Sequence, residues 1–257
     1  MTFDEILAQV TDSAAQIPEG WGQGRACFGG LVAAVLYAPL GRLIDDRPVR
    51  SITVSFVGPV APGPVTLETE ILRTGKSVTQ AQSRLRQNGE TLAVMLASFG
   101  KARSSEIRVP SAAAPNMKRP EEGMPMPRVK GMVPDFTFHF DFRWAEGDAP
   151  FSRSDRGLIG GWVRFAEPTS EQGVASLLAL VDAWPPAVLP MYSRPAPGSS
   201  LTWTIEFLQD GPFTGEWWQY RADTEYAGDG YCHAAANLWN DQGEMVAISR
   251  QTVTVFI

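Results

Sequence analysis

Two segments of the chain are apolar on every face, and a series of strand-like segments follows each of them. Residues 31–38 carry no charged side chain, and the same holds for residues 174–181. A helix without a polar face has to be buried on nearly all sides. We therefore predict two buried helices, one over residues 31–38 and one from Gly173 to about Asp182, with Pro185-Pro186 ending the second.

Segments rich in Val, Ile, Thr and Phe follow each predicted helix and are separated by turn residues. The predicted strands are residues 50–58, 64–73, 78–87 and 90–102 in the first half, and about 199–209, 216–226, 231–239 and 244–256 in the second. Strict alternation predicts a further strand over residues 136–142, and residues 161–165 indicate another. Near the start, residues 3–16 have helical spacing, and Thr2 and Glu5 form a capping box.

The two halves of the chain repeat each other. Three turn signals recur 153 or 154 residues later: Gly58-Pro59 as Gly211-Pro212, Gly75 as Gly228, and Gly89-Glu90 as Gly243-Glu244. The repeated unit is far longer than a solenoid repeat, which indicates a duplicated domain. We expect one unit over residues 1–109 and a second over 135–257. A proline-rich inter-unit linker over 110–134 would run across the surface.

An apolar helix followed by an antiparallel meander is typical of an α+β fold in which the sheet wraps around a central helix. This is the hotdog pattern. Two copies in one chain predict a double hotdog, with two tandem hotdog units, each having an antiparallel sheet around its central helix. Fusion of the two units would bury the sheet edge and the helix face that each leaves open.

Composition narrows the function classes. The 257 residues are 44% hydrophobic and 19% charged, as in globular proteins. The net charge of −6, without a basic stripe, argues against a nucleic-acid partner. No stretch approaches the roughly 18 apolar residues of a membrane span, and the N-terminus has no signal-like segment. Cys27 and Cys232 form no metal or disulfide pattern. We expect a cytoplasmic protein without metal, cofactor or membrane partner.

The differences between the copies indicate where chemistry could lie. When the two copies are aligned, three positions are more polar in the second copy than in the first. Asp182 corresponds to Ala38, Thr202 to Ser51, and Gln251 to Ala97. Asp182 shares its helix face with Leu178 and Ala175. A carboxylate buried there must find hydrogen-bond donors or become neutral. The alternative is a solvent-exposed Asp182 at the helix end.

The other two polar residues lie on predicted strands. Gln251 shares a strand face with Ala247 and Val253, so it points toward the core, as a functional or a structural amide. Alternation places Thr202 on the polar face of its strand, and only a β-bulge near 198–200 would turn its side chain inward.

Other residues that could form a functional site are less suited to one. Cys232 and His233 are adjacent in a strand and face opposite sides, so they cannot form a nucleophile–base pair. His139 alternates with Phe138 and Phe140, so we expect it to be either solvent-facing or a structural histidine of the core. The glycines from Gly22 to Gly30 do not have dinucleotide-binding spacing.

Several motifs, taken in order, resemble the acyl-CoA thioesterase II family of the thioesterase-like superfamily. They are Phe28-Gly29-Gly30, residues 72–78, 87–90 and 97–99 in the first half, and residues 161–164, Asp182, Ser200-Leu201-Thr202 and Gln251 in the second. The resemblance implies a double hotdog enzyme that hydrolyses medium- or long-chain acyl-CoA to fatty acid and CoA. It also implies that Asp182, Thr202 and Gln251 activate a water molecule, and that the chain forms a homodimer or higher homo-oligomer. Residues 203–210 depart from the family pattern.

Glycine at the start of the first apolar helix would let a substrate approach the backbone closely. The N–H groups of Gly29 and Gly30 could then bind the negative charge that develops on a thioester carbonyl. In this arrangement the first copy contributes Gly29 and Gly30 to a site whose polar side chains come from the second copy. The sequence thus predicts one site per chain.

Two alternatives stay open. A catalytically silent acyl-CoA or acyl-carrier binding module on the same fold would bind the ligand without turnover. A hydratase or dehydratase would need an Asp/His pair across a helix start, and neither His139 nor His233 lies near one.

Overall fold

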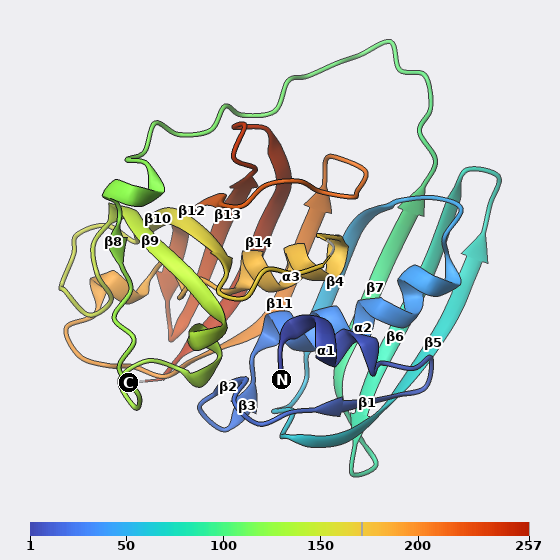
Figure 1. Cartoon of the computed structure of the whole chain (residues 1–257), viewed down its shortest axis with the longest axis horizontal. Coiled ribbons are helices and arrows are strands. Elements are labelled where there is room, and N and C mark those ends of the chain that lie inside the picture. Colours follow the sequence, from blue (N-terminus) through green and yellow to red (C-terminus); the bar gives the residue numbers. More distant parts are fainter. Residues whose placement is uncertain (171, 257) are drawn as a thin grey trace.

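The computed structural model describes residues 1–170 and 172–256. Two apolar helices, α2 (Gly29–Leu43) and α3 (Val174–Asp182), pack against each other, and a large curved sheet wraps around them (Figure 1). Both are buried along most of their length. The two helices predicted from their apolar character are therefore confirmed.

Twelve of the described strands form one sheet in which all neighbours are antiparallel. In spatial order they are β1 (Ala14–Ile17), β5 (Gly63–Thr74), β6 (Val78–Gln87), β7 (Glu90–Gly100), β4 (Val49–Phe56), β11 (Gly198–Phe207), β14 (Met245–Val255), β13 (Tyr231–Trp239), β12 (Trp218–Gly228), β10 (Leu158–Phe165), β9 (Phe140–Gly147) and β8 (Met124–Pro125). The pair β4 and β11 joins the two halves of the chain. The α+β arrangement with an antiparallel sheet is confirmed.

The two halves share one order of connections. In the first half, α2 leads into β4, and β4 pairs with the last strand of that half, β7. In the second half, α3 leads into β11, which pairs with β14 in the same way. The repeat seen in the sequence thus corresponds to a repeated topology. It brings the starts of both meanders together at the centre of the sheet.

The predicted helix over residues 3–16 is wrong beyond its first two turns. Helix α1 (Phe3–Ala8) has the predicted Thr2–Glu5 capping box, but residues 14–17 form β1. The hydroxyl of Thr11 accepts the N–H of Ala14 and turns the chain, and β1 then pairs with the edge strand β5. Local apolar spacing gave no sign of this pairing, because the partner residues, Gly63 to Thr66, lie far along the chain.

The predicted strand over residues 136–142 is also wrong in its first half. Residues 135–139 form the 3-10 helix η2 (Asp135–His139), and β9 begins only at Phe140. Phe136 stacks on Phe28 with 4.2 Å between ring centroids, and His139 stacks on Trp21 at 3.9 Å. These rings therefore cover the core, and the structural interpretation of His139 fits its contacts.

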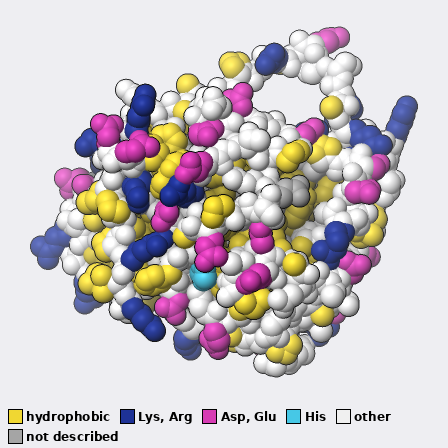
Figure 2. All heavy atoms as spheres, in the orientation of Figure 1, with side chains coloured by type: hydrophobic (Ala, Val, Ile, Leu, Met, Phe, Trp, Pro, Cys, Tyr) yellow, Lys and Arg dark blue, Asp and Glu magenta, His cyan; other side chains and the backbone are white. Residues whose placement is uncertain are grey.

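The remaining elements are short. They are β2 (Gly22–Gln23), β3 (Ala26–Cys27), η1 (Pro120–Glu122) and η3 (Leu189–Met191). After β7 the chain runs over the molecule to the second half (Figure 1). Acidic and basic side chains are interspersed on the face shown in Figure 2. None of the described helices has the length and apolarity that crossing a bilayer requires.

Candidate active site

Asp182 is the last residue of α3 and is partly buried. The side-chain amide of Gln251 donates a hydrogen bond of 2.6 Å to its Oδ1. The backbone N–H of Gly30 also donates to this carboxylate. Asp182 is thus not simply hydrated at an exposed helix end, and its carboxylate lies at the N-terminus of α2.

The start of α2 is built to receive this carboxylate. The first N–H groups of a helix have no internal partner and carry a partial positive charge. A Cβ atom on Gly29 would lie 2.8 Å from Oδ2 of Asp182 and 3.2 Å from the ring of Phe56. A Cβ on Gly30 would lie 3.0 Å from Cα of Ala179 in α3. The glycine pair therefore lets both the carboxylate and α3 approach α2 closely.

Burial controls the charge of Asp182. Removal from water raises the pKa of this carboxyl from 3.8 to about 7, although the hydrogen bonds from Gln251 and Gly30 lower it. Desolvation disfavours the charged form, and donors to the carboxylate favour it. A group with a pKa near 7 can accept a proton and release it again at neutral pH, as a general base requires.

Gln251 reaches Asp182 from the inner face of the sheet. It lies in β14, opposite Trp203 of β11. Trp203 is buried, and its indole N–H donates a bond of 2.8 Å to Oγ of Ser249. Directly opposed residues of an antiparallel pair share a face. The packed Trp203 therefore identifies the inner face, and Gln251 points inward as its alternation predicts.

Thr202 is not brought to this pair. It is exposed and lies opposite Thr252 in β14, so alternation places it on the face away from Gln251. The register of β11 does shift between Ser200 and Thr202, where a bulge was considered, but the shift leaves Thr202 pointing outward. The structure therefore gives no support to a role for Thr202 at Asp182.

The same register shift puts Ser200 on the inner face. Ser200 is opposite Val253, which is buried and lies two residues from Gln251. A Cβ on Gly198, two residues before Ser200, would lie 3.9 Å from Pro186 in the segment that follows α3. This part of β11 therefore looks toward the segment that follows α3. Sequence reasoning missed Ser200 because regular alternation does not reveal a bulge.

The thiols do not offer a nucleophile. Burial raises the pKa of Cys27 to about 12, and burial also raises that of Cys232. A thiol must ionise before it can attack. Among the residues that the structure describes, no group of three or more His, Cys, Asp or Glu side chains gathers as a metal site would require. The groups that the structure brings together at this candidate site are the Asp182 carboxylate, the Gln251 amide and the N–H of Gly30.

Comparisons with known proteins agree on the family. Residues 17–100 match the acyl-CoA thioesterase N-terminal domain, and residues 113–255 match the acyl-CoA thioesterase C-terminal domain. The chain belongs to the acyl-CoA thioesterase family. It is accordingly a thioester hydrolase. A comparison with curated protein sequences finds no match.

Solved structures establish the fold of this acyl-CoA thioesterase. A conserved protein of unknown function with a hot dog fold from Alicyclobacillus acidocaldarius is 24% identical, with a TM-score of 0.88 over 99% of this chain and 98% of that chain. The acyl-CoA thioesterase II TesB2 from Mycobacterium marinum is 20% identical, with a TM-score of 0.79 over 99% and 98%. The dehydratase domain of RzxB from Pseudomonas fluorescens is 12% identical, with a TM-score of 0.58 over 95% and 89%. The hotdog fold is thus confirmed.

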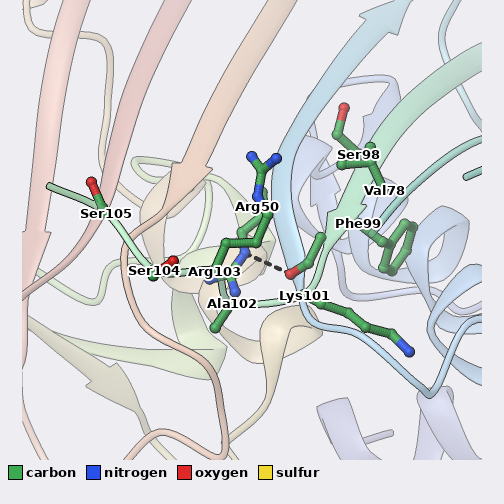
Figure 3. A pocket seen from close by; sticks show the side chains of 10 residues that line it. Arg50, Val78, Ser98, Phe99, Lys101, Ala102, Arg103, Ser104 and Ser105 are labelled. Carbon is green, nitrogen blue, oxygen red and sulfur yellow. Dashed lines mark hydrogen bonds between the residues drawn. The ribbon is translucent and has the colours of Figure 1, made fainter. Parts of the chain in front are cut away.

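A cavity of about 570 Å³ lies elsewhere in the thioesterase, beside Arg50 and Lys101 (Figure 3). Arg50 is bonded to Asp210 and to the carbonyl of Gly100, and Lys101 pairs with Asp46. Arg50 is six residues from Phe56 along β4, or roughly 20 Å. This cavity is therefore separate from Asp182, and carboxylates already offset both of these charges.

Proposed function

We propose that the protein hydrolyses medium- or long-chain acyl-CoA with a water molecule that Asp182 activates and Gln251 orients. The observation that carries this proposal is the 2.6 Å bond from Gln251 to Asp182 at the start of α2. It joins a carboxylate with a raised pKa, an amide and a set of helix N–H donors in one place. Membership of the acyl-CoA thioesterase family supports the choice of thioester.

The proposed reaction proceeds in two steps. Asp182 accepts a proton from water as the water oxygen bonds to the thioester carbonyl carbon, and the carbonyl oxygen becomes negatively charged. The C–S bond then breaks, the carbonyl re-forms, and the proton passes from Asp182 to the departing thiolate. The products are a fatty acid and CoA. Asp182 returns to its charged form, and no covalent enzyme intermediate is formed.

The oxyanion would be bound at the start of α2. The N–H of Gly30 is engaged by Asp182, which leaves the N–H of Gly29 as the proposed donor. First-turn N–H groups carry positive partial charge and are fixed before the reaction, so they stabilise developing negative charge without reorganising. For the hydroxyl of the site we favour Ser200 over Thr202, because Ser200 lies opposite the buried Val253 on the inner face of the sheet, the face from which Gln251 reaches Asp182.

The proposal includes a double hotdog with one site per chain. Residues 1–109 and 135–257 would be the two units, and residues 110–134 the linker. The repeated connection of α2 to β4 and of α3 to β11 supports this division. In the first unit, the position that corresponds to Gln251 is Ala97, which is buried and cannot orient a water molecule. Self-association into a homodimer or larger oligomer stays a prediction.

Thiol release from acyl-CoA substrates of increasing chain length tests the proposal. Asp182→Ala and Gln251→Ala should lower kcat, the first by about 10²–10⁴-fold, which is the usual contribution of a general base. Gln87→Ala is the matched control, because Gln87 is a buried amide that bonds the backbone of Ala61 in the first half. Full kcat in the folded Asp182 variant would rule out its role. Binding without turnover by the wild type would favour the acyl-binding module.

A further inference from the structure

Next to the end of α3, one row of residues that runs across the strands of the sheet contains a glycine between two large aromatic residues. Trp144 of β9, Gly161 of β10 and Tyr220 of β12 lie in one row across three neighbouring strands. Trp144 and Tyr220 are buried, with 8% and 7% of their surface exposed. Gly161 has no side chain, so the row has a space between two large rings.

Trp184 fills this space, and it follows Asp182 by two residues. Its ring stacks on Tyr220 with 5.4 Å between centroids and a 5° angle, and meets Trp144 edge-on at 5.1 Å. A Cβ atom on Gly161 would lie 2.8 Å from Cη2 of Trp184 and would collide with the carbonyl of Arg143. Trp184 is 5% exposed. Glycine at position 161 is therefore what lets the ring lie against the sheet.

Ring packing, and not a hydrogen bond, holds Trp184 in this place. Its indole Nε1 is buried and has no hydrogen-bond partner among the described residues. Phe142 also meets the ring edge-on, at 5.4 Å and 85°. Aromatic pairs in these geometries stabilise a structure beyond what their buried area alone contributes. A phenyl ring at position 184 could keep most of these contacts.

We propose that Trp184, seated over Gly161 between Trp144 and Tyr220, is the positioning residue that fixes the Asp182 carboxylate against the start of α2. This inference rests on the proposed role of Asp182 as general base. Helix α3 has only nine residues, and Asp182 is the last of them. The end of a helix frays unless it is held by other contacts. The Trp184 ring, packed against the sheet two residues after Asp182, supplies such contacts.

The polar surroundings of Asp182 make its proton affinity a readout of position. Gln251 from β14 and the N–H of Gly30 from α2 bond the carboxylate, and burial has the largest effect on its pKa. The titratable group that faces it is the Tyr220 hydroxyl of β12, whose own pKa is raised by burial and by the charge of Asp182. A carboxylate released from its place would gain water, and its pKa would fall toward the ordinary value.

The experiment compares Trp184→Ala, Trp184→Phe and Trp162→Ala with the wild type. We measure kcat and KM for one acyl-CoA substrate across the pH range and record thermal unfolding. Trp162 is the matched control, because it is the neighbouring indole on β10 and its Nε1 bonds the carbonyl of Lys118. Alternation places it on the face away from Trp184.

For Trp184→Ala, we expect kcat to fall between about tenfold and 100-fold, the size of effect that a misplaced catalytic group produces. The acidic limb of its pH profile should move to lower pH. Trp184→Phe should restore both properties, and Trp162→Ala should leave both unchanged. A purely structural role would lower the unfolding temperature without moving the limb. A folded Trp184→Ala variant with the wild-type kcat and limb would overturn the inference.

Two further comparisons separate the outcomes. If Trp184→Ala does not fold, Tyr220→Leu decides. It removes the stacking partner and should move the limb in the same direction, whereas Tyr220→Phe should not; an unmoved limb in Tyr220→Leu would overturn the inference. Asp182→Ala tests the underlying function. An active Asp182→Ala variant would contradict the general base itself. If Asp182→Ala is inactive while Trp184→Ala keeps the wild-type kcat and pH profile, only the positioning role of Trp184 is contradicted.

Discussion

The amide of Gln251 donates a 2.6 Å hydrogen bond to Oδ1 of Asp182, although the two residues lie 69 positions apart in the chain. Gln251 is held on the inner face of β14, and Asp182 ends α3. The carboxylate also accepts the N–H of Gly30 at the start of α2. Through these two hydrogen bonds, the Asp182 carboxylate links β14 and α3 of the second half of the chain to α2 of the first half.

We predict that activity rises with pH through a midpoint close to neutrality. Asp182 acts as a base only when charged, and burial raises its pKa to about 7. An ordinary aspartate would be charged throughout the range above about pH 5. Measurement of kcat/KM for an acyl-CoA between about pH 5 and pH 9 should show this acidic limb.

Gln251 supplies the control for this profile. Its bond lowers the pKa of Asp182. Gln251→Leu should therefore move the acidic limb to higher pH and lower kcat. A profile that is flat down to about pH 5 in the wild type would show that no group with the raised pKa of Asp182 limits the reaction.

We predict that Asp182→Asn stabilises the protein at alkaline pH. The pKa of Asp182 is raised on folding from 3.8 to about 7. Its contribution to stability is therefore fully present below about pH 4 and is lost as pH rises through about 7. The loss is at most about 4 kcal/mol, since one pKa unit corresponds to about 1.4 kcal/mol. Asparagine cannot ionise, and a flip of the Gln251 amide would let it bond both neighbours.

Urea unfolding at about pH 4.5 and about pH 8.5 measures this difference. The free energy of unfolding of the variant, relative to the wild type, should be larger at the higher pH. Asp46→Asn is the control of opposite sign, because Arg47 and Lys101 hold the pKa of Asp46 below its usual range. It should bring no gain at alkaline pH. An Asp182→Asn variant whose relative stability is the same at both pH values would contradict the raised pKa.

Both central helices and most of the meander strands could be predicted from the sequence, because their apolar patterns are local. Helix α3 lies at Val174–Asp182, and the sequence indicates Gly173 to about Asp182. Strands β6 and β13 have the predicted bounds. The failures depend on distant partners. Residues 14–17 became β1 because β5 offers an open edge, and residues 135–139 turned into η2 where their rings meet Phe28 and Trp21.

The candidate site divides in the same way. Asp182 and Gln251 stand out in the sequence because a polar residue interrupts an apolar face, and the structure places them in contact. The sequence could not show whether the hydroxyl of Thr202 or that of Ser200 points to the inner face of the sheet, because one register shift in β11 decides this. Trp184 carried no signal at all. Its place depends on Gly161, which lies in a different strand.

We predict different effects of alanine at Gly29 and Gly30, the two glycines that begin α2. In Gly29→Ala the new Cβ would lie 2.8 Å from Oδ2 of Asp182, so the carboxylate must move and kcat should fall at least tenfold. In Gly30→Ala the Cβ would lie 2.5 Å from Cζ of Phe28 and 3.0 Å from Cα of Ala179, so the buried Phe28 ring must move and α3 must shift away from α2. Overpacking of this kind costs about 1–3 kcal/mol. Gly29→Ala should therefore lose activity more than stability, and Gly30→Ala should lose both.

Steady-state kinetics and thermal unfolding of the two variants, measured side by side, check this pair. Gly89→Ala provides a control at a hairpin turn far from the site, where φ is +84° and a Cβ meets no atom within 4 Å. It should lose some stability through backbone strain while its kcat stays unchanged. Full activity in a folded Gly29→Ala variant would show that the carboxylate does not work where the structure places it.

Our last prediction separates the two hydroxyls of β11. Ser200 lies opposite the buried Val253 on the inner face, whereas Thr202 is exposed opposite Thr252. Ser200→Ala removes a hydroxyl from the inner face of β11, the side of the sheet on which Gln251 meets Asp182, and should lower kcat. The loss should be smaller than that of Asp182→Ala, because one hydrogen bond to the attacking water contributes about 1 kcal/mol, or roughly fivefold. Thr202→Ala should change kcat by less than about twofold, since surface substitutions have small effects.

Thiol-release assays on both variants, at one pH above the acidic limb, decide the question. If Thr202→Ala loses activity while Ser200→Ala keeps it, the register shift does not determine which hydroxyl serves the site, and β11 must adopt the other register when substrate binds.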